Sequence, residues 1–179
     1  MATVKWALDT SHSQLQFKVR HMMLTTVTGE FKKFDIQVDT EGNDFGTAKI
    51  NVSVDIDSIT SGAEQRDVHL KSDDFFNAEK FPQMTFKGES LMHVGDDHWI
   101  LNGDLTIRDI TKKVSFEVLY MGMIDDPWGN KKVGFEVNGK VQRKEFGLLW
   151  NVVTEAGGVV ASDDVRIHGN VQFIRQKEA

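Results

Sequence analysis

The residues best suited to chemistry lie in a polar segment from Gly62 to Phe81, where Arg66, Asp67 and His69 fall within four positions. If this segment is helical, Arg66 and His69 share one face, because residues three apart are neighbours on a helix. Both side chains could then donate hydrogen bonds to a carboxylate, phosphate or quinone oxygen of a ligand. The alternative is structural: Arg66 pairs with Asp67 or Asp73 and holds the segment in place.

Motifs for catalysis or metal binding are missing from the sequence. There is no glycine-rich phosphate loop, no dinucleotide fingerprint, no Gly-x-Ser-x-Gly and no His-Glu-x-x-His. The six histidines show no metal-ligand spacing. The chain has no cysteine, which excludes disulfides, thiolate metal sites and cysteine nucleophiles. We therefore expect no cofactor, no metal site and no catalytic residues.

Length and charge limit the partners. The 179 residues carry 21 Lys and Arg against 27 Asp and Glu, a net charge of −6. Because nucleic-acid binders concentrate positive charge, this balance argues against a nucleic-acid partner. The length suits one domain over residues 1–179, and no apolar run reaches the ~18 residues that would span a bilayer. Without a signal-like amino terminus, we expect a cytoplasmic protein, or a periplasmic one if a signal has been removed.

Apolar and polar residues alternate along much of the chain. From Ala48 to Ile56 every second residue is apolar, which predicts a strand with one dry face and one wet face. Short links rich in Gly, Asn and Asp separate such stretches and suit antiparallel neighbours. An all-β barrel or sandwich follows. The other stretches with this pattern are 15–19, 34–38, 85–87 (the weakest), 99–107, 114–120, 133–137 and 165–173.

Large apolar side chains on the predicted dry faces have two interpretations. A barrel of about eight strands either fills with side chains or holds one small ligand, and periodicity does not choose between them. Methionines could line an adaptable tunnel, although filling gaps in a core is their commoner use. The aromatic residues concerned are Phe17, Phe31, Phe34, Trp99, Phe116 and Phe135, and the methionines are Met22, Met23, Met84 and Met92.

The polar segment interrupts the strand pattern. Ala63 to Lys71 is compatible with a helix, and Asp73 could begin a second short turn. Pro82 prevents helix immediately before it. We expect one or two short helices inserted between strands.

Several motifs resemble the YceI-like, polyisoprenoid-binding family from about Trp6 to Phe173. The most specific lies in the inserted segment. The matching stretches are Asp9-Thr10-Ser11-His12-Ser13, Phe17-x-Val19-x-His21-Met22, Gly29-Glu30-Phe31-x-x-Phe34, Arg66-Asp67-x-His69-Leu70-x-Ser72-x-Asp74-Phe75-Phe76, Lys80-Phe81-Pro82, Gly103-Asp104-Leu105-Thr106-Ile107 and Arg143-Lys144-Glu145-Phe146-Gly147-Leu148.

The resemblance implies a lipocalin-like, extended antiparallel β-barrel of about eight strands enclosing an apolar cavity. It also implies a homodimer without catalysis and an amphipathic ligand such as a polyprenyl chain, an isoprenoid quinone or a fatty-acid-like lipid. With the residue patterns above, it predicts a ligand site formed by Phe17, His21, Phe31, Phe34, Arg66, His69, Trp99, Phe116, Phe135 and Arg143.

Three functions compete at this point. The first is a non-enzymatic carrier or store of a long apolar ligand, which requires shape and dryness but few polar groups. The second is an enzyme acting on a small apolar substrate inside the barrel, with His21, Arg66 and His69 as its acid–base group. The third is a stress-response interaction protein whose barrel is filled by side chains.

Overall fold

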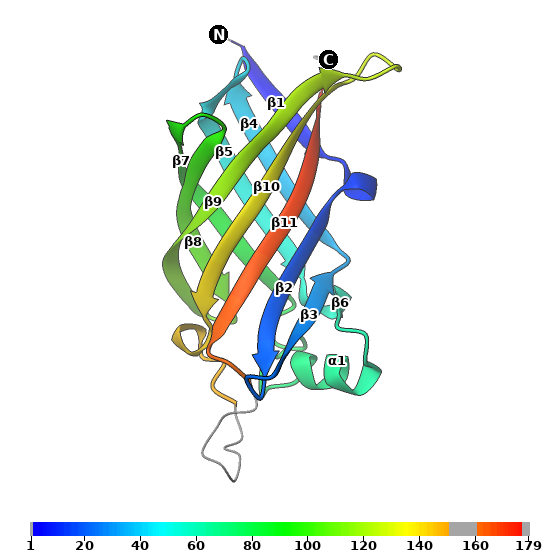
Figure 1. The fold of residues 1–179 in the computed structure, drawn as a ribbon, viewed down its shortest axis with the longest axis vertical. Coiled ribbons are helices and arrows are strands. Elements are labelled where there is room, and N and C mark those ends of the chain that lie inside the picture. Colours follow the sequence, from blue (N-terminus) through cyan, green and yellow to red (C-terminus); the bar gives the residue numbers. More distant parts are fainter. Residues whose placement is uncertain (1, 151–160, 177–179) are drawn as a thin grey trace.

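The described part of the chain folds into a barrel of antiparallel strands with one α-helix at one end (Figure 1). The computed structural model describes residues 2–150 and 161–176. The elements are β1 (Thr3–Leu8), η1 (Thr10–His12), β2 (Gln14–His21), β3 (Thr25–Phe31), β4 (Phe34–Glu41), β5 (Asp44–Asp55), η2 (Ile56–Ser58), β6 (Ile59–Thr60), α1 (Glu64–Lys71), β7 (Gln83–Gly95), β8 (His98–Ile107), β9 (Ile110–Asp125), β10 (Lys131–Gln142), η3 (Arg143–Phe146) and β11 (Asp164–Arg175).

The closed ring contains eight strands in the order β1-β4-β5-β7-β8-β9-β10-β11, and β11 pairs with β1 to complete it. Strands β2, β3 and β6 prolong three members of this ring beyond short interruptions. Strand β11 pairs with β2 through 166–170 and with β1 through 173–175. The expected lipocalin-like antiparallel barrel of about eight strands is therefore confirmed.

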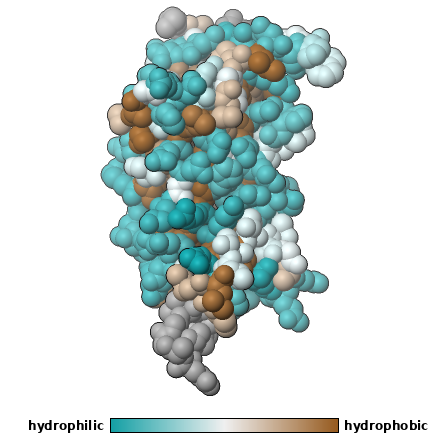
Figure 2. Space-filling model, viewed as in Figure 1, coloured by the Kyte–Doolittle hydropathy of each residue, from teal (hydrophilic) through white to brown (hydrophobic). Residues whose placement is uncertain are grey.

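Alternation places the apolar side chains inside the barrel. In β5, Ile50 and Val54 are buried, whereas Lys49 and Asn51, on either side of Ile50, are exposed. Hydrophilic side chains cover most of the outer face visible in Figure 2. Seven of the eight predicted stretches lie in different strands of the ring, and the eighth, 15–19, lies in β2, which prolongs β1. Strand β7 is far longer than residues 85–87 suggest.

Three of the described strands were not predicted from the sequence: β1, β3 and the two-residue β6. Strand β3 is rich in Thr and contains Gly29, a residue that normally weakens a strand. The structure explains this glycine, because Phe17 lies directly opposite it in β2. A Cβ atom on Gly29 would lie 2.1 Å from Cζ of Phe17, so the aromatic ring rests on the backbone of β3.

Two more aromatic rings lie against the barrel wall in the same way. A Cβ on Gly139 would lie 2.2 Å from the ring of Phe116, and one on Gly103 would lie 2.5 Å from the ring of Phe86. A ring that packs against a glycine can lie closer to the wall of the barrel than a ring that packs against a larger residue. The three glycines therefore help to keep the interior open.

An aromatic cluster fills the barrel at the end away from α1. Its members are Trp6, Phe45, Phe135 and Phe173, which come from β1, β5, β10 and β11. The ring centroids of Phe45 lie 5.2 Å from those of both Trp6 and Phe135, and Phe135 lies 6.2 Å from Phe173. We call these four residues the aromatic plug.

At the opposite end, α1 and the turns after it pack beside the barrel (Figure 1). The helix matches the prediction closely, but residues 73–80 form turns in place of a second helix. Arg108, in the β8–β9 turn, donates to the carbonyl oxygens of Asp73 and Phe75 and to the Asp73 carboxylate. Over residues 2–150 and 161–176, no helix is both long and apolar enough to cross a membrane.

A half-buried carboxylate, that of Asp9, organises the break between β1 and β2. Asp9 accepts hydrogen bonds from Ser11 and His12, each 2.8 Å long, and Lys132 of β10 lies 3.1 Å away. Burial by itself raises the pKa of Asp9, but the bonds from His12, Ser11 and Lys132 outweigh it and hold the pKa well below its usual range. The charged form of Asp9 therefore stabilises the folded chain.

Replacing Asp9 by Asn is expected to lower the free energy of unfolding at neutral pH by about 1–2 kcal/mol, because charge-assisted hydrogen bonds are lost. Since the folded-state pKa is lowered, the contribution is complete above the unfolded-state pKa of about 4 and disappears as the pH falls further. Urea unfolding of both proteins at a series of pH values checks this. A difference that persists unchanged at pH values well below 4 would contradict it.

Candidate functional site

Two neighbouring cavities occupy the barrel. Cavity 1, next to α1, has a volume of about 310 Å³, and cavity 2, further inside, has a volume of about 140 Å³. Leu15, Met84 and Ile167 line both, so the two cavities meet at these side chains. The interior is thus not completely filled by its own residues, which does not fit the hypothesis of a filled core.

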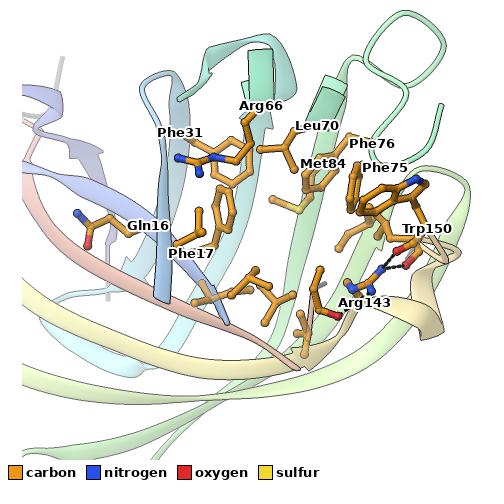
Figure 3. Close-up of a pocket in the computed structure, with 18 of the residues that line it drawn as sticks. Gln16, Phe17, Phe31, Arg66, Leu70, Phe75, Phe76, Met84, Arg143 and Trp150 are labelled. Carbon is orange, nitrogen blue, oxygen red and sulfur yellow. Dashed lines mark hydrogen bonds between the residues drawn. The ribbon is translucent and has the colours of Figure 1, made fainter. Parts of the chain in front are cut away.

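Cavity 1 combines apolar walls with a polar rim (Figure 3). Its walls include Phe17 of β2 and Phe31 of β3, whose ring centroids are 5.5 Å apart. Leu70 of α1 and Phe76 contribute from the side of the insert. The polar residues that line cavity 1 are Gln16, Arg20, His21, Arg66, His69 and Arg143.

Arg66 is held beside cavity 1 by Ser61 rather than by an aspartate. Its Nε donates to Ser61 Oγ over 2.8 Å, and its Nη2 donates to the Ser61 carbonyl oxygen. The Asp67 carboxylate accepts from the backbone N–H of Ser61 and from its hydroxyl group. Arg66 Nη1 makes no hydrogen bond with any residue in the described part of the chain, so Arg66 keeps donors for a ligand while its other nitrogens anchor α1.

His69 lies among aromatic side chains at the edge of cavity 1. Its Nε2 lies 2.9 Å from the Asp74 carboxylate. Its ring meets the rings of Phe75 and Trp150 edge to face, with centroids 5.1 and 4.7 Å away. The Asp74 contact and the two rings orient the imidazole at the rim. Asp73, the partner suggested for Arg66 by the structural interpretation, pairs with Arg108 instead.

Arg143 approaches cavity 1 from another side and is 4% exposed. Its guanidinium donates to four main-chain carbonyl oxygens, those of Leu148, Trp150, Ala161 and Ser162. Burial lowers the pKa of Arg143, and the nearby Asp163 carboxylate opposes that shift. Arg143 therefore shapes the cavity wall by holding the chain on either side of residues 151–160.

The ten residues of the predicted ligand site do not all reach the same place. Phe34 and Trp99 line neither cavity, since both pack half-buried against the core, and the ring centroid of Trp99 lies 5.0 Å from that of His93 in a tilted arrangement. Six residues meet around cavity 1, and two lie deeper, around cavity 2. The six are Phe17, His21, Phe31, Arg66, His69 and Arg143, and the two are Phe116 and Phe135.

Of the four methionines proposed to line a tunnel, only Met84 lines the cavities. Met92 is 49% exposed, and Met22 and Met23 stand at the tip of the β2–β3 turn next to the rim residue His21. Sequence reasoning also missed Leu15, Ile167, Leu148 and other lining residues. Alternation marked Leu15 and Ile167 as inward-facing, but nothing local distinguishes an inward residue that borders open space from one that is packed.

The side chains around cavity 1 can bind an oxygen-bearing head group, but their arrangement does not suit a metal ion. No group of three or more His, Asp or Glu residues in the described ranges could hold one. Arginine donors and a histidine at the rim, with an apolar space behind them, are suited to an amphipathic molecule.

Comparison of the sequence with known proteins identifies a family and several relatives. The model of the YceI-like domain matches residues 6–173. A UPF0312 protein of Staphylococcus aureus (strain USA300) is 36% identical over 169 residues, which are 94% of this chain and 96% of that protein. A UPF0312 protein from strain N315 of the same species is 35% identical over the same shares.

Solved structures show the same fold. The YceI protein of Campylobacter jejuni superimposes with a TM-score of 0.76 at 28% identity, covering 89% of this chain and 90% of its own. BcnA of Burkholderia cenocepacia reaches 0.78 at 21% identity, with 92% and 98% covered. A polyisoprenoid binding domain from Saccharophagus degradans, implicated in plant cell wall breakdown, reaches 0.67 at 14% identity, with 96% and 98% covered.

Proposed function

The chain belongs to the YceI-like family, and from this membership and the shape of the barrel we propose that it binds a long amphipathic lipid reversibly, without catalysis. The polar head of the lipid lies at the rim of cavity 1, near Arg66 and His69. Its apolar tail extends along the barrel past Phe17 and Phe31. Carriage or storage of such a molecule requires no reaction inside the barrel.

The observation that supports this best is the difference in polarity between the two cavities. In the described part of the chain, cavity 1 has six polar residues around it, three of them arginines, whereas Thr85 is the sole polar side chain that lines cavity 2. A site that is polar at one end and dry at the other matches a molecule with a head and a tail. It also supports entry with the tail first, toward cavity 2.

The energetics suit a long chain. Burial of each methylene group contributes about 0.8 kcal/mol, so a dozen buried carbons contribute of order 10 kcal/mol before the entropy cost of association. No precise polar geometry is needed for that gain. The ligand classes favoured are a polyprenyl chain, an isoprenoid quinone and a fatty-acid-like lipid, the first being what the Saccharophagus domain is named for.

Catalysis on a small apolar substrate is the weaker alternative. Of the proposed acid–base group, His69 already contacts Asp74 and Arg66 already donates to Ser61. Both contacts serve to position α1 and its neighbouring turns. With these contacts in place, the rim of cavity 1 can still hold a polar head group. The contacts do not define a position for a reacting atom of a substrate.

Extraction of the protein with organic solvent, after purification from its native source, tests the proposed function. Mass spectrometry of the extract is expected to show an amphipathic lipid in a near-stoichiometric amount. A clean extract, combined with no detectable binding of fatty alcohols, fatty acids, prenols or quinones, would refute lipid binding.

Replacing Arg66 by Ala is expected to weaken binding of a fatty acid about tenfold while leaving binding of the hydrocarbon of the same length nearly unchanged. A charge-assisted hydrogen bond to the head group contributes about 1.5–3 kcal/mol, and a hydrocarbon does not make it. Titration calorimetry with both ligands measures the difference.

Lys71→Ala is the matched control, because this substitution removes the same charge from the same helix. Lys71 does not line cavity 1. A melting curve for each variant completes the test. Equal losses for both ligands, together with a lowered melting temperature, would show that Arg66 only anchors α1 to Ser61.

A further inference from the structure

The length of the apolar tail that the barrel accepts can be inferred from its two cavities. The aromatic plug closes the far end of the barrel, and the side chains of Leu15, Met84 and Ile167 lie where the two cavities meet. We propose that the barrel is a closed-ended tube that limits the apolar chain to about 18 carbons, and that the chain passes a constriction at Met84 to reach this length. This inference rests on the proposed function and adds the length class of its ligand.

The constriction comes from opposite walls of the barrel. In the ring of eight strands, β7 and β11 are four positions apart and therefore face each other across the interior. Met84 extends from β7, and Ile167 from β11. Leu15, on the adjacent β2, pairs with Gly169 of β11, which is two residues from Ile167, so it is the diagonal neighbour of Ile167. All three border both cavities, so a tail going from cavity 1 to cavity 2 must pass between Met84 and the other two.

Met84 can give way to such a tail. Its side chain is unbranched and flexible, and methionine adapts to irregular apolar shapes more easily than a branched residue. Leu15 and Ile167 are only half-buried although they point inward, which fits side chains that border open space. The passage therefore opens by rotation of the thioether chain, without movement of the strands.

The aromatic plug ends the tube. Phe45, Phe135 and Phe173 line cavity 2, and Trp6 packs behind Phe45. Trp6 is 2% exposed, and its indole N–H donates to the buried Thr40 hydroxyl over 2.9 Å. This hydrogen bond fixes the ring that closes the barrel, so a tail in cavity 2 has no exit past the plug.

The volumes convert into a chain length. An apolar cavity of about 150 Å³ holds one benzene ring, which has six carbons. Cavity 1, at about 310 Å³, then accepts about 12 carbons, and cavity 2, at about 140 Å³, accepts about 6 more. The total of about 18 carbons corresponds to a common fatty chain, or to between three and four isoprene units. A much longer polyprenyl chain would have to leave part of its length outside.

The test measures affinity for straight-chain alcohols of about 8 to about 24 carbons, by displacement of an apolar fluorescent dye. In the unaltered protein the affinity is expected to rise by up to about fourfold per carbon and to level off near 18 carbons. Val52 lines cavity 2 alone, so Val52→Phe should bring the plateau forward to about 12 carbons. The affinity for the 18-carbon alcohol should then fall at least tenfold, while that for the 10-carbon alcohol stays the same.

Two further variants sharpen the result. Val94→Phe makes the same change on a residue that is 58% exposed outside the barrel, and it should leave the length profile unaltered. Phe45→Ala opens the plug and should move the plateau to longer chains. If Phe45→Ala fails to fold, the Val52→Phe comparison decides alone.

The outcomes separate this inference from the proposed function. Affinity that climbs steadily beyond about 20 carbons, or a plateau near 12 carbons that Val52→Phe does not shift, overturns the length limit while lipid binding stands. Absence of binding at every length, together with a lipid-free extract, overturns the proposed function itself.

Discussion

Replacing Arg143 by Ala is expected to lower the free energy of unfolding by about 3–5 kcal/mol, the effect of breaking a buried charged network. Arg143 is 4% exposed and donates to the carbonyl oxygens of Leu148, Trp150, Ala161 and Ser162, at distances from 2.6 to 3.3 Å. Alanine removes every one of these donors at once. Each buried carbonyl oxygen left without a partner then keeps its desolvation penalty.

Denaturant unfolding of Arg143→Ala beside two comparison variants measures this effect. Arg143→Lys keeps the charge but lacks the planar fork of five donors, so it should recover only part of the stability. Arg166→Ala removes an exposed arginine from β11 and should change stability by less than about 0.5 kcal/mol. A small loss for Arg143→Ala, accompanied by a large loss of lipid affinity, would assign Arg143 to ligand contact and contradict a role in holding the wall.

Replacing Gly29 by Ala is expected to destabilise the protein by about 3 kcal/mol, the upper end of the range for overpacking. The added Cβ would lie 2.1 Å from Phe17 Cζ, which is closer than two non-bonded carbon atoms can approach. The ring of Phe17 must therefore move. Because Phe17 lines cavity 1, a displaced ring should also reduce lipid binding. Thermal melting and dye displacement measure the two effects.

A double-mutant cycle isolates the clash. Phe17→Ala should make Gly29→Ala nearly harmless, since the ring that opposes the new methyl group is gone. Gly134→Ala is the matched control, because a Cβ there would lie 3.6 Å from its nearest neighbour, at ordinary contact distance. If Gly29→Ala were as mild as Gly134→Ala, the ring of Phe17 would not rest on the β3 backbone.

Much of the barrel could be predicted from local pattern. Side chains along a strand point alternately to its two faces, so the period of two in β5 identifies the inward residues without knowledge of the neighbours. The helix α1 was equally readable from Ala63 to Lys71. Strand β3 was not, because Gly29 normally weakens a strand and is explained only by the ring of Phe17 opposite it on β2.

The candidate site was predictable in part. Arg66 and His69 share a helix face because they are three residues apart, and both reach cavity 1. Their partners were not predictable. Ser61 and Asp74 were selected by the way α1 and its turns fold back, and Arg108, 35 residues after Asp73, by the packing of the β8–β9 turn.

The sequence by itself determined which residues face inward, since a strand's two faces are set by the covalent chain. Only the tertiary structure decided which inward residues border open space. Phe116 lies along the wall because Gly139, on the adjacent strand, leaves room for its ring. Met84 faces Ile167 across the interior because closure of the ring sets β7 opposite β11. A cavity is the volume that side chains from separate strands leave unfilled, so it exists only after the barrel has closed.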